Sequence, residues 1–222
     1  MTNTKKVLII GAHGKIGKIL TKKLKGHSDF EPTAFIRKEE QKAYFEEMNV
    51  PTVLANLEDT VENLTPAFKN FDAVVFAAGS GGKTGLEKTM SIDLDGAAKS
   101  VEACEAAGVK RFVMISASHS DDRTFWDKAD MKPYYIAKHY ADQMLQNSSL
   151  DYTILRPVML TDNEGTGKII ASGSAEKVQE KIAREDVAET IVHVLANDNT
   201  IGKIIEISSG EKQVKEALME MV

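Results

Sequence analysis

The sequence predicts an α/β fold with a parallel, doubly wound sheet. Short, continuously apolar runs alternate with stretches of helical periodicity along almost the whole chain. Continuous apolar runs are typical of strands that helices cover on both faces. The 222 residues, 42% of them hydrophobic, suit one domain with a sizeable core. We therefore expect a single domain over residues 1–222, in which residues 157–222 form a small substrate-side region.

Local signals place the elements in order along this domain. The first helix, 15–25, has apolar residues at helical spacing and ends at Gly26, a suitable C-cap. Pro133 suits the first turn of a later helix, and acidic residues suit the start of the one at 185. A polar loop is expected over 118–132. The expected strands are 7–10, 32–36, 50–54, 72–78, 110–115, 151–155, 168–171 and 203–207; the expected helices are 15–25, a short one around 44–48, a long one over 86–107, 133–146, 185–195 and 213–220.

Three glycines at a spacing of three residues separate the first strand from the first helix. A strand that ends in such a turn and continues as a helix is typical of a site that cradles a dinucleotide pyrophosphate. The N-terminus of the helix favours the negative charge of the phosphates. The spacing G-x-x-G-x-x-G departs from the most general fingerprint, and an ordinary turn is the alternative. The turn residues that we expect at the cofactor are Gly11, His13, Gly14, Lys15, Ile16 and Gly17.

The ends of the following strands indicate which dinucleotide binds. Ligands of doubly wound sheets bind beyond the carboxyl ends of the strands. About 20 residues after the glycine turn, where an NAD site carries an acidic residue, stands Arg37. Arginine can hold a 2′-phosphate with two parallel hydrogen bonds, so the sequence predicts NADP rather than NAD, unless Arg37 is a solvated surface charge. Further expected contacts are Asn56 and Leu57 at the adenine and the small residues Ala77, Ala78 and Gly79 at the ribose and pyrophosphate.

Tyr134 and Lys138 stand one helical turn apart on the helix predicted over 133–146. An ammonium about 4–5 Å from a phenol, at an effective dielectric near 20, favours the phenolate by roughly 3–4 kcal/mol. The pair thus predicts a lowered pKa of Tyr134 and an acid/base for carbonyl reduction or alcohol oxidation. Lys138 would also hydrogen-bond the nicotinamide ribose, and Ser116 or Ser118 would donate to a developing alkoxide. An amphipathic surface pair is the alternative interpretation.

Composition excludes several classes of function. The net charge of −5 argues against a nucleic-acid-binding surface. A single cysteine, Cys104, excludes an intrachain disulfide and a cysteine-based metal site, and favours the cytoplasm. No apolar run approaches the roughly 20 residues that span a membrane, and no set of His, Asp and Glu has metal-ligand spacing. We expect a small-molecule substrate, no metal, and a monomer or homodimer.

Taken together, these motifs resemble the short-chain dehydrogenase/reductase superfamily, whose dinucleotide-binding domain has the Rossmann-type fold. The glycine spacing and the Arg156-Pro157 pair after the sixth strand resemble its atypical branch, which includes proteins labelled NAD(P)-binding or NAD-dependent epimerase/dehydratase-like and NmrA-like relatives. The resemblance covers nearly the whole chain. It implies that Tyr134, Lys138 and a serine, Ser116 or Ser118, are catalytic and that Pro157 borders the cofactor. Asp93 stands where extended members often carry an Asn.

The resemblance implies an NADP-dependent oxidoreductase that transfers hydride to or from a small carbonyl, quinone or flavin-like substrate. Two alternatives remain. One is a non-catalytic NADP(H)-sensing protein of the NmrA-like type, since this branch often loses catalysis. The other is a sugar epimerase/dehydratase-like enzyme. The latter is disfavoured because only 65 residues follow Pro157, too few for the substrate domain of extended members. A small or flat substrate under the loops 118–132 and 161–167 is the expectation.

Overall fold

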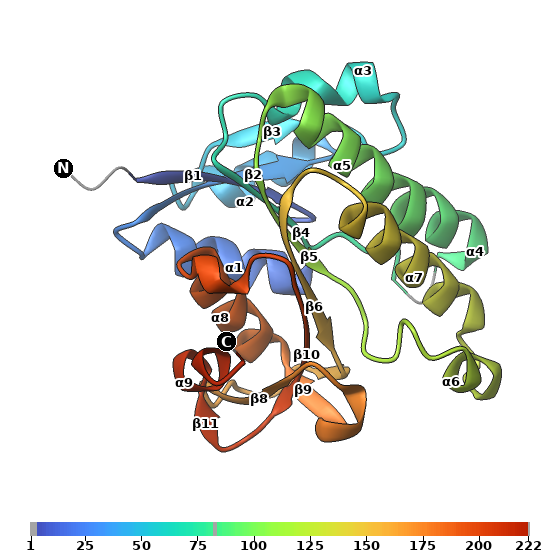
Figure 1. Ribbon diagram of the computed structural model, residues 1–222. Coiled ribbons are helices and arrows are strands. Elements are labelled where there is room, and N and C mark those ends of the chain that lie inside the picture. The colour runs from blue at the N-terminus through green and yellow to red at the C-terminus, as the bar shows by residue number, and fades with distance from the viewer. Residues whose placement is uncertain (1–3, 82–83, 222) are drawn as a thin grey trace.

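The computed structural model describes residues 4–81 and 84–221, which form a large twisted sheet between two layers of helices (Figure 1). The strand order is β11-β8-β10-β6-β5-β4-β1-β2-β3. The seven strands from β10 to β3 run parallel, whereas β8 pairs antiparallel with β10 and β11 antiparallel with β8. The strands are β1 (Lys5–Ile10), β2 (Phe30–Ile36), β3 (Thr52–Leu54), β4 (Ala73–Phe76), β5 (Arg111–Ile115), β6 (Asp151–Pro157), β8 (Lys168–Ser172), β10 (Lys203–Ser209) and β11 (Lys212–Gln213), with β7 (Met159–Thr161) and β9 (Lys181–Ala183) in a separate parallel pair.

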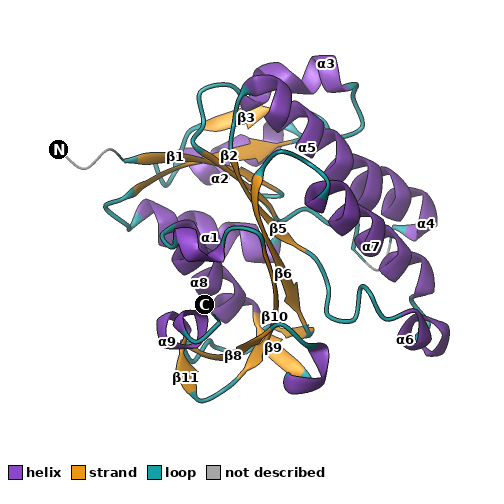
Figure 2. Ribbon diagram, viewed as in Figure 1, coloured by secondary structure: helices purple, strands orange, loops and turns teal. Residues whose placement is uncertain are grey.

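The helices cover both faces of the sheet, so the predicted doubly wound α/β architecture is confirmed (Figure 2). Helices α1, α8 and α9 lie on one face, and α3, α5 and α7 on the other. The helix bounds are α1 (Lys15–Lys25), α2 (Lys42–Glu46), α3 (Val61–Leu64), α4 (Gly85–Lys88), α5 (Asp95–Ala107), α6 (Arg123–Lys128), α7 (Lys132–Gln146), α8 (Arg184–Leu195) and α9 (Val214–Met219).

Strand β1 shows why its sequence is continuously apolar. Side chains alternate across a strand, and both sides of β1 are buried. Val7 and Ile9 pack into the core beneath α1 and α8, whereas Leu8 and Ile10 pack into the core beneath α5. All four are completely buried. The two cores therefore meet at the central strand that carries the glycine turn.

Two expectations within the helices need correction. The single helix predicted over 86–107 is instead α4, a π-helical turn over Thr89–Leu94, and α5. The loop predicted over 118–132 contains α6, which Asp122 caps by accepting a hydrogen bond from the Phe125 N–H at 3.0 Å. Trp126 of this helix is buried, and its indole N–H donates to the His119 carbonyl at 2.8 Å. Burial of one indole thus orders a segment whose polar composition indicated a loop.

The C-terminal part of the chain is more regular than predicted. Strands β7, β9 and β11 have two or three residues each, too few to show a periodic pattern. Strand β8 extends the sheet from Lys168 to Ser172, close to its predicted position. Within residues 4–81 and 84–221, no helix has both the length and the apolar character needed to cross a membrane.

Candidate functional site

The glycine turn between β1 and α1 has no room for side chains at two of its positions. Gly11 has φ +79°, and a Cβ there would lie 2.6 Å from the Ala78 nitrogen. A Cβ on Gly17 would overlap the Gly11 carbonyl oxygen. The Gly14 N–H donates to the same carbonyl at 2.9 Å, which closes the turn. The α1 N-terminus has no acidic residue in its first turn, which suits an incoming anion.

Replacing Gly17 by alanine should therefore lower the free energy of unfolding by about 3 kcal/mol, because backbone atoms cannot yield to the new methyl group as a flexible side chain would. Urea unfolding measures the effect. Gly26→Ala is the matched control at the other end of α1. It has a helical φ of −81°, and its Cβ would meet its nearest neighbour at 3.6 Å, so it should stay within about 0.5 kcal/mol of wild type. Equal stability of the two variants would contradict the inference that the turn has no room for a side chain at Gly17.

A cavity of about 480 Å³ opens at the carboxyl ends of β1, β2 and β4. This is the switch point of the doubly wound sheet: β1 leads to β2 and β3 on one side, and the chain then crosses to β4 on the other side of β1. Sequence reasoning did not single out Gln41, Ser80, Lys88 and Ile92, which also line it. Nine of the predicted cofactor residues line the cavity: Gly11, His13, Gly14, Arg37, Asn56, Leu57, Ala77, Ala78 and Gly79.

The other predicted cofactor residues lie outside the lining of this cavity. Lys15 forms an ion pair with Asp162 at 2.5 Å. Ile16 packs into the core, and Gly17 lies against the backbone of the turn. Lys138 is buried in α7, and the Pro157 carbonyl at the end of β6 accepts the Ser118 N–H at 3.0 Å. The cavity is thus formed by the turn and the strand ends rather than by the helix that follows.

The end of the cavity at β2 is rich in donors and positive charge. The side-chain oxygen of Gln41 accepts the backbone N–H groups of Arg37 at 3.0 Å and Lys38 at 3.2 Å. Lys88, on α4, forms an ion pair with Glu58 at 2.6 Å and lowers the pKa of that carboxyl. Arg37 and Lys88 therefore bring two cations to the cavity from segments 51 residues apart in sequence.

The Tyr134–Lys138 pair lies on α7, which packs against the π-helical turn that borders the cavity through Ile92. The Lys138 ammonium is buried and donates to the Ile115 carbonyl at 2.7 Å. The predicted lowering of the Tyr134 pKa is wrong. Burial raises the pKa of that phenol, and the Asp93 carboxylate raises it further. Burial also lowers the pKa of the neighbouring Lys138 ammonium.

The predicted serines lie beyond the end of β5. Ser116 and Ser118 are both buried, and their backbone N–H groups continue the pairing with β6 by donating to the Leu155 and Pro157 carbonyls. Among the residues described, neither hydroxyl oxygen has a hydrogen-bond partner. Both oxygens are closed off from solvent, and the Ser118 hydroxyl lies near enough to the Glu206 carboxyl to lower its pKa.

A buried charge network lies beside these serines and was not expected from the sequence. The Arg156 guanidinium contacts three carboxylates: Asp121 at 2.8 Å, Asp142 at 3.0 Å and Glu206 at 3.5 Å. Arg156 and Glu206 face each other on the neighbouring strands β6 and β10. Burial raises the pKa of Glu206 to about 7, and Arg156 offsets only part of that shift.

Glu206 should make stability depend on pH. Its carboxyl group binds a proton more tightly in the folded chain than in the unfolded chain. Its contribution is therefore complete below the ordinary pKa of 4.5 and lost as the pH rises through about 7. The loss is on the order of 3 kcal/mol. Glu206→Gln should abolish this dependence and exceed wild type in stability at pH 8, measured by urea unfolding at pH 5 and 8. Glu211→Gln, an exposed control between β10 and β11, should show the same change in stability from pH 5 to pH 8 as wild type. The same change in all three proteins would contradict the proposed effect of Glu206 on stability.

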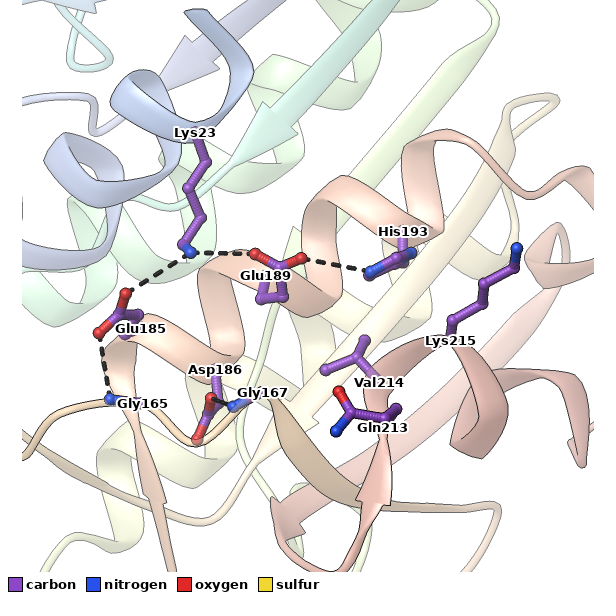
Figure 3. A pocket seen from close by; sticks show the side chains of 10 residues that line it. All are labelled: Lys23, Gly165, Gly167, Glu185, Asp186, Glu189, His193, Gln213, Val214 and Lys215. Atoms are coloured by element: carbon purple, nitrogen blue, oxygen red, sulfur yellow. Dashed lines mark hydrogen bonds and ion pairs between the residues drawn. The ribbon is translucent and has the colours of Figure 1, made fainter. Parts of the chain in front are cut away.

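A second cavity, of about 260 Å³, lies between α1, α8 and α9 (Figure 3). Lys23 pairs there with Glu189 at 2.9 Å and Glu185 at 3.6 Å, and Glu189 also contacts His193 at 3.3 Å. The pKa of Lys23 is raised, because the two carboxylates together outweigh the lowering effect of burial. The charges of Lys23, Glu185, Glu189 and His193 thus pair with one another, whereas Lys215 and Gln213, also in the lining, are drawn without a partner among these residues. Across the described ranges, no cluster of three His, Cys, Asp or Glu side chains is arranged to bind a metal ion.

Comparisons with known proteins agree with this geometry. The model of a family described as NAD(P)H-binding matches residues 11–198. The uncharacterized sugar epimerase YhfK of Bacillus subtilis is 45% identical over 97% of this chain and 100% of its own. A structure from Bacillus halodurans, named as a candidate NAD-dependent epimerase/dehydratase, has a TM-score of 0.90 and 40% identity over 98% of this chain and all of its own. The oxidoreductase ylbE of Lactococcus lactis has a TM-score of 0.85 and 36% identity over 97% and 95% of the two chains.

Proposed function

The chain belongs to the NAD(P)H-binding family, and on that premise we propose that it is an NADP-dependent oxidoreductase acting on a small carbonyl, quinone or flavin-like substrate. Family membership agrees with the resemblance to atypical short-chain dehydrogenases/reductases. The observation that carries the proposal is the cavity at the switch point, which joins the glycine turn, Arg37 and the small residues 77–79. The turn suits a pyrophosphate, since the absence of side chains at Gly11 and Gly17 lets β4 and α1 pack directly against it, and the backbone of Gly11 and Gly14 lines the cavity.

Arg37 supports NADP as the cofactor. Its guanidinium lines the cavity and can pair with a 2′-phosphate through two hydrogen bonds, whereas the charge of Lys88 in the same lining is balanced by Glu58. An NAD site would instead carry an acidic residue at the end of β2 to accept the ribose hydroxyls.

Tyr134 supports proton transfer in the direction of reduction. A bound nicotinamide would supply or accept the hydride. The Tyr134 phenol is protonated at neutral pH, so it could donate a proton to an oxygen that gains negative charge, although burial and the Asp93 carboxylate raise its pKa and so make it a weaker acid than a free phenol. In this proposal the Ser116 or Ser118 hydroxyl would donate a hydrogen bond to that oxygen. Lys138 would hydrogen-bond the nicotinamide ribose.

Calorimetric titration with NADPH and NADH, followed by absorbance at 340 nm with a panel of carbonyls, quinones and flavins, tests the proposal. We expect tighter binding of NADPH and oxidation of NADPH by at least one acceptor. Tighter binding of NADH would contradict the role of Arg37. Binding without hydride transfer to any acceptor would favour the NADP(H)-sensing alternative.

The epimerase/dehydratase alternative is favoured by one observation, the names of the Bacillus subtilis and Bacillus halodurans relatives. Such an enzyme would return its cofactor to the starting redox state. Product formed from a nucleotide sugar with no net change at 340 nm would support it.

Location and assembly are part of the same proposal. We place the protein in the cytoplasm, acting on a small molecule without a nucleic-acid partner, as a monomer or homodimer. The net charge of −5 and the single cysteine support the location and the absence of a nucleic-acid partner. Light scattering after gel filtration distinguishes the two assembly states.

A further inference from the structure

The α6 segment, residues 121–128, is an exposed stretch between the end of β5 and the start of α7. Figure 1 shows α6 at the periphery of the molecule, beside one end of α7, and the two helices pack against each other. Six of the eight residues of the segment are exposed. A stretch with so little buried surface opens locally at a lower free energy than the sheet does. The contacts that hold it closed therefore decide how often it opens.

The chain directly before the segment is fixed to α7. The Ser120 hydroxyl donates to the Asp142 carboxylate at 2.9 Å, and the Ser120 carbonyl accepts from His139 Nδ1 at 3.0 Å. One residue earlier, the His119 carbonyl accepts the indole N–H of Trp126 at 2.8 Å. This last bond joins the fixed part of the chain to the segment, so it must break when the segment opens.

Asp121 links the segment to the sheet. Its carboxylate pairs with Arg156 Nη1 at 2.8 Å; the Asp121 side chain is 61% exposed, whereas that of Arg156 is 4% exposed. Burial raises the pKa of the Asp121 carboxyl, but the guanidinium lowers it overall. The other ion pairs that the described part of the chain gives this segment join residues three and five positions apart. Asp121 is thus the charged contact that ties the segment to a strand.

The guanidinium that holds Asp121 is shared with two buried carboxylates. Nη1 of Arg156 also contacts Glu206 at 3.5 Å, so one nitrogen faces two carboxylates, and Nη2 pairs with Asp142 at 3.0 Å. Glu206 and Asp142 are buried and cannot exchange the guanidinium for water. Asp121 can, because its side chain is exposed. One guanidinium does not balance three carboxylates, and the exposed one costs least to release.

The charge of Glu206 therefore changes how strongly Arg156 holds Asp121. Burial raises the pKa of Glu206 to about 7, and the Asp121 carboxylate adds to the rise. Such a coupling is reciprocal, so an ionised Glu206 weakens the contact of Asp121 in return. The titratable or polar groups around this contact are Arg156 on β6, Asp121 in the segment, Asp142 and His139 on α7 and the Ser118 hydroxyl after β5.

We propose that Arg156 is a positioning residue that holds the α6 segment closed through Asp121, and that ionisation of Glu206 releases the segment. The inference rests on the proposed function for what the segment covers. The segment follows the end of β5, and its Phe125 packs against Tyr135, the neighbour of Tyr134. Release would open the substrate side of the site as the pH rises.

Hydrogen exchange of the Trp126 indole N–H, followed by nuclear magnetic resonance of the full chain, tests the proposal without turnover. Trp126 is the one tryptophan of the chain, so its indole resonance needs no assignment. Protection is the exchange rate of free N-acetyltryptophanamide divided by that of Trp126 at the same pH. We expect wild-type protection to fall by about tenfold from pH 6 to pH 8, which corresponds to a coupling of one pKa unit. Glu206→Gln should retain its protection at pH 8, and Asp121→Asn should have low protection at both pH values.

Asp127→Asn is the matched control. Asp127 is an exposed residue of the same helix that pairs with Lys132 at the start of α7, so its replacement should give the wild-type profile. Equal wild-type protection at the two pH values, or undiminished protection in Asp121→Asn, would overturn the proposal. So would an equal loss at the backbone amides of β4 in Asp121→Asn at pH 6, because that loss would indicate global unfolding.

Kinetics separate this proposal from the proposed function. Asp121→Asn should raise the KM of a responsive acceptor and leave the affinity for NADPH unchanged, because Asp121 and Arg156 lie outside the lining of the cofactor cavity. Lost protection with an unchanged KM would overturn the role of the segment at the substrate. Lost protection without hydride transfer to any acceptor supports the Asp121–Arg156 contact and contradicts the oxidoreductase, whereas turnover with unaltered protection does the reverse.

Discussion

Tyr134→Phe should lower the rate of hydride transfer to a responsive acceptor by about 100- to 10,000-fold while leaving NADPH binding within a few-fold of wild type. The substitution removes the hydroxyl that donates a proton and keeps the ring. The ring packs against Tyr135 with centroids 5.5 Å apart, so the fold of α7 should survive. Stopped-flow absorbance at 340 nm measures the rate, and calorimetry measures the affinity.

Tyr135→Phe is the matched control for this experiment. Tyr135 is the next residue on the same helix, and its replacement by Phe removes the same hydroxyl group. Its ring packs edge-on against Phe125, at 5.4 Å, and against Tyr134. We expect wild-type rates. Undiminished turnover in Tyr134→Phe would remove the proton donor from the proposal, and equal losses in both variants would indicate a structural effect.

Arg37→Ala should weaken NADPH binding by about 10- to 100-fold and leave NADH binding nearly unchanged. One hydrogen bond to a charged group contributes about 1.5–3 kcal/mol, so the net loss of a single such bond accounts for this change, and the 2′-phosphate is the group that distinguishes the two cofactors. The ratio of the two dissociation constants, measured by calorimetry, isolates this effect from any general damage to the cavity.

Lys42→Ala is the control for Arg37. Lys42 begins α2, close in sequence to Arg37, but its ammonium pairs with the exposed carboxylates of Glu39 at 3.8 Å and Glu46 at 3.6 Å. It should leave the NADPH/NADH ratio unchanged. A parallel loss of affinity for both cofactors in Arg37→Ala would show that Arg37 supports the cavity without recognising the phosphate.

Much of the fold and of the cofactor cavity could be predicted because both depend on local patterns. An apolar run that ends in glycines determines β1, the turn and α1, and the observed helix has the predicted bounds, Lys15–Lys25. The strand ends of a parallel sheet meet at one edge, which brings Arg37 and Gly79 into the cavity of Gly11. The π-helical turn could not be predicted, since its residues have ordinary helical composition.

The sequence by itself determined the alternation of strands and helices, the glycine turn and the identity of the residues at the strand ends. Only the tertiary structure decided the charges of the site. Glu206 meets Arg156 across two strands 50 residues apart, and Asp93, in the π-helical turn, raises the pKa of Tyr134 on α7. The free energy of a charge depends on its burial and on neighbours in space, so a Tyr-x-x-x-Lys spacing could not reveal that the Tyr134 pKa is raised.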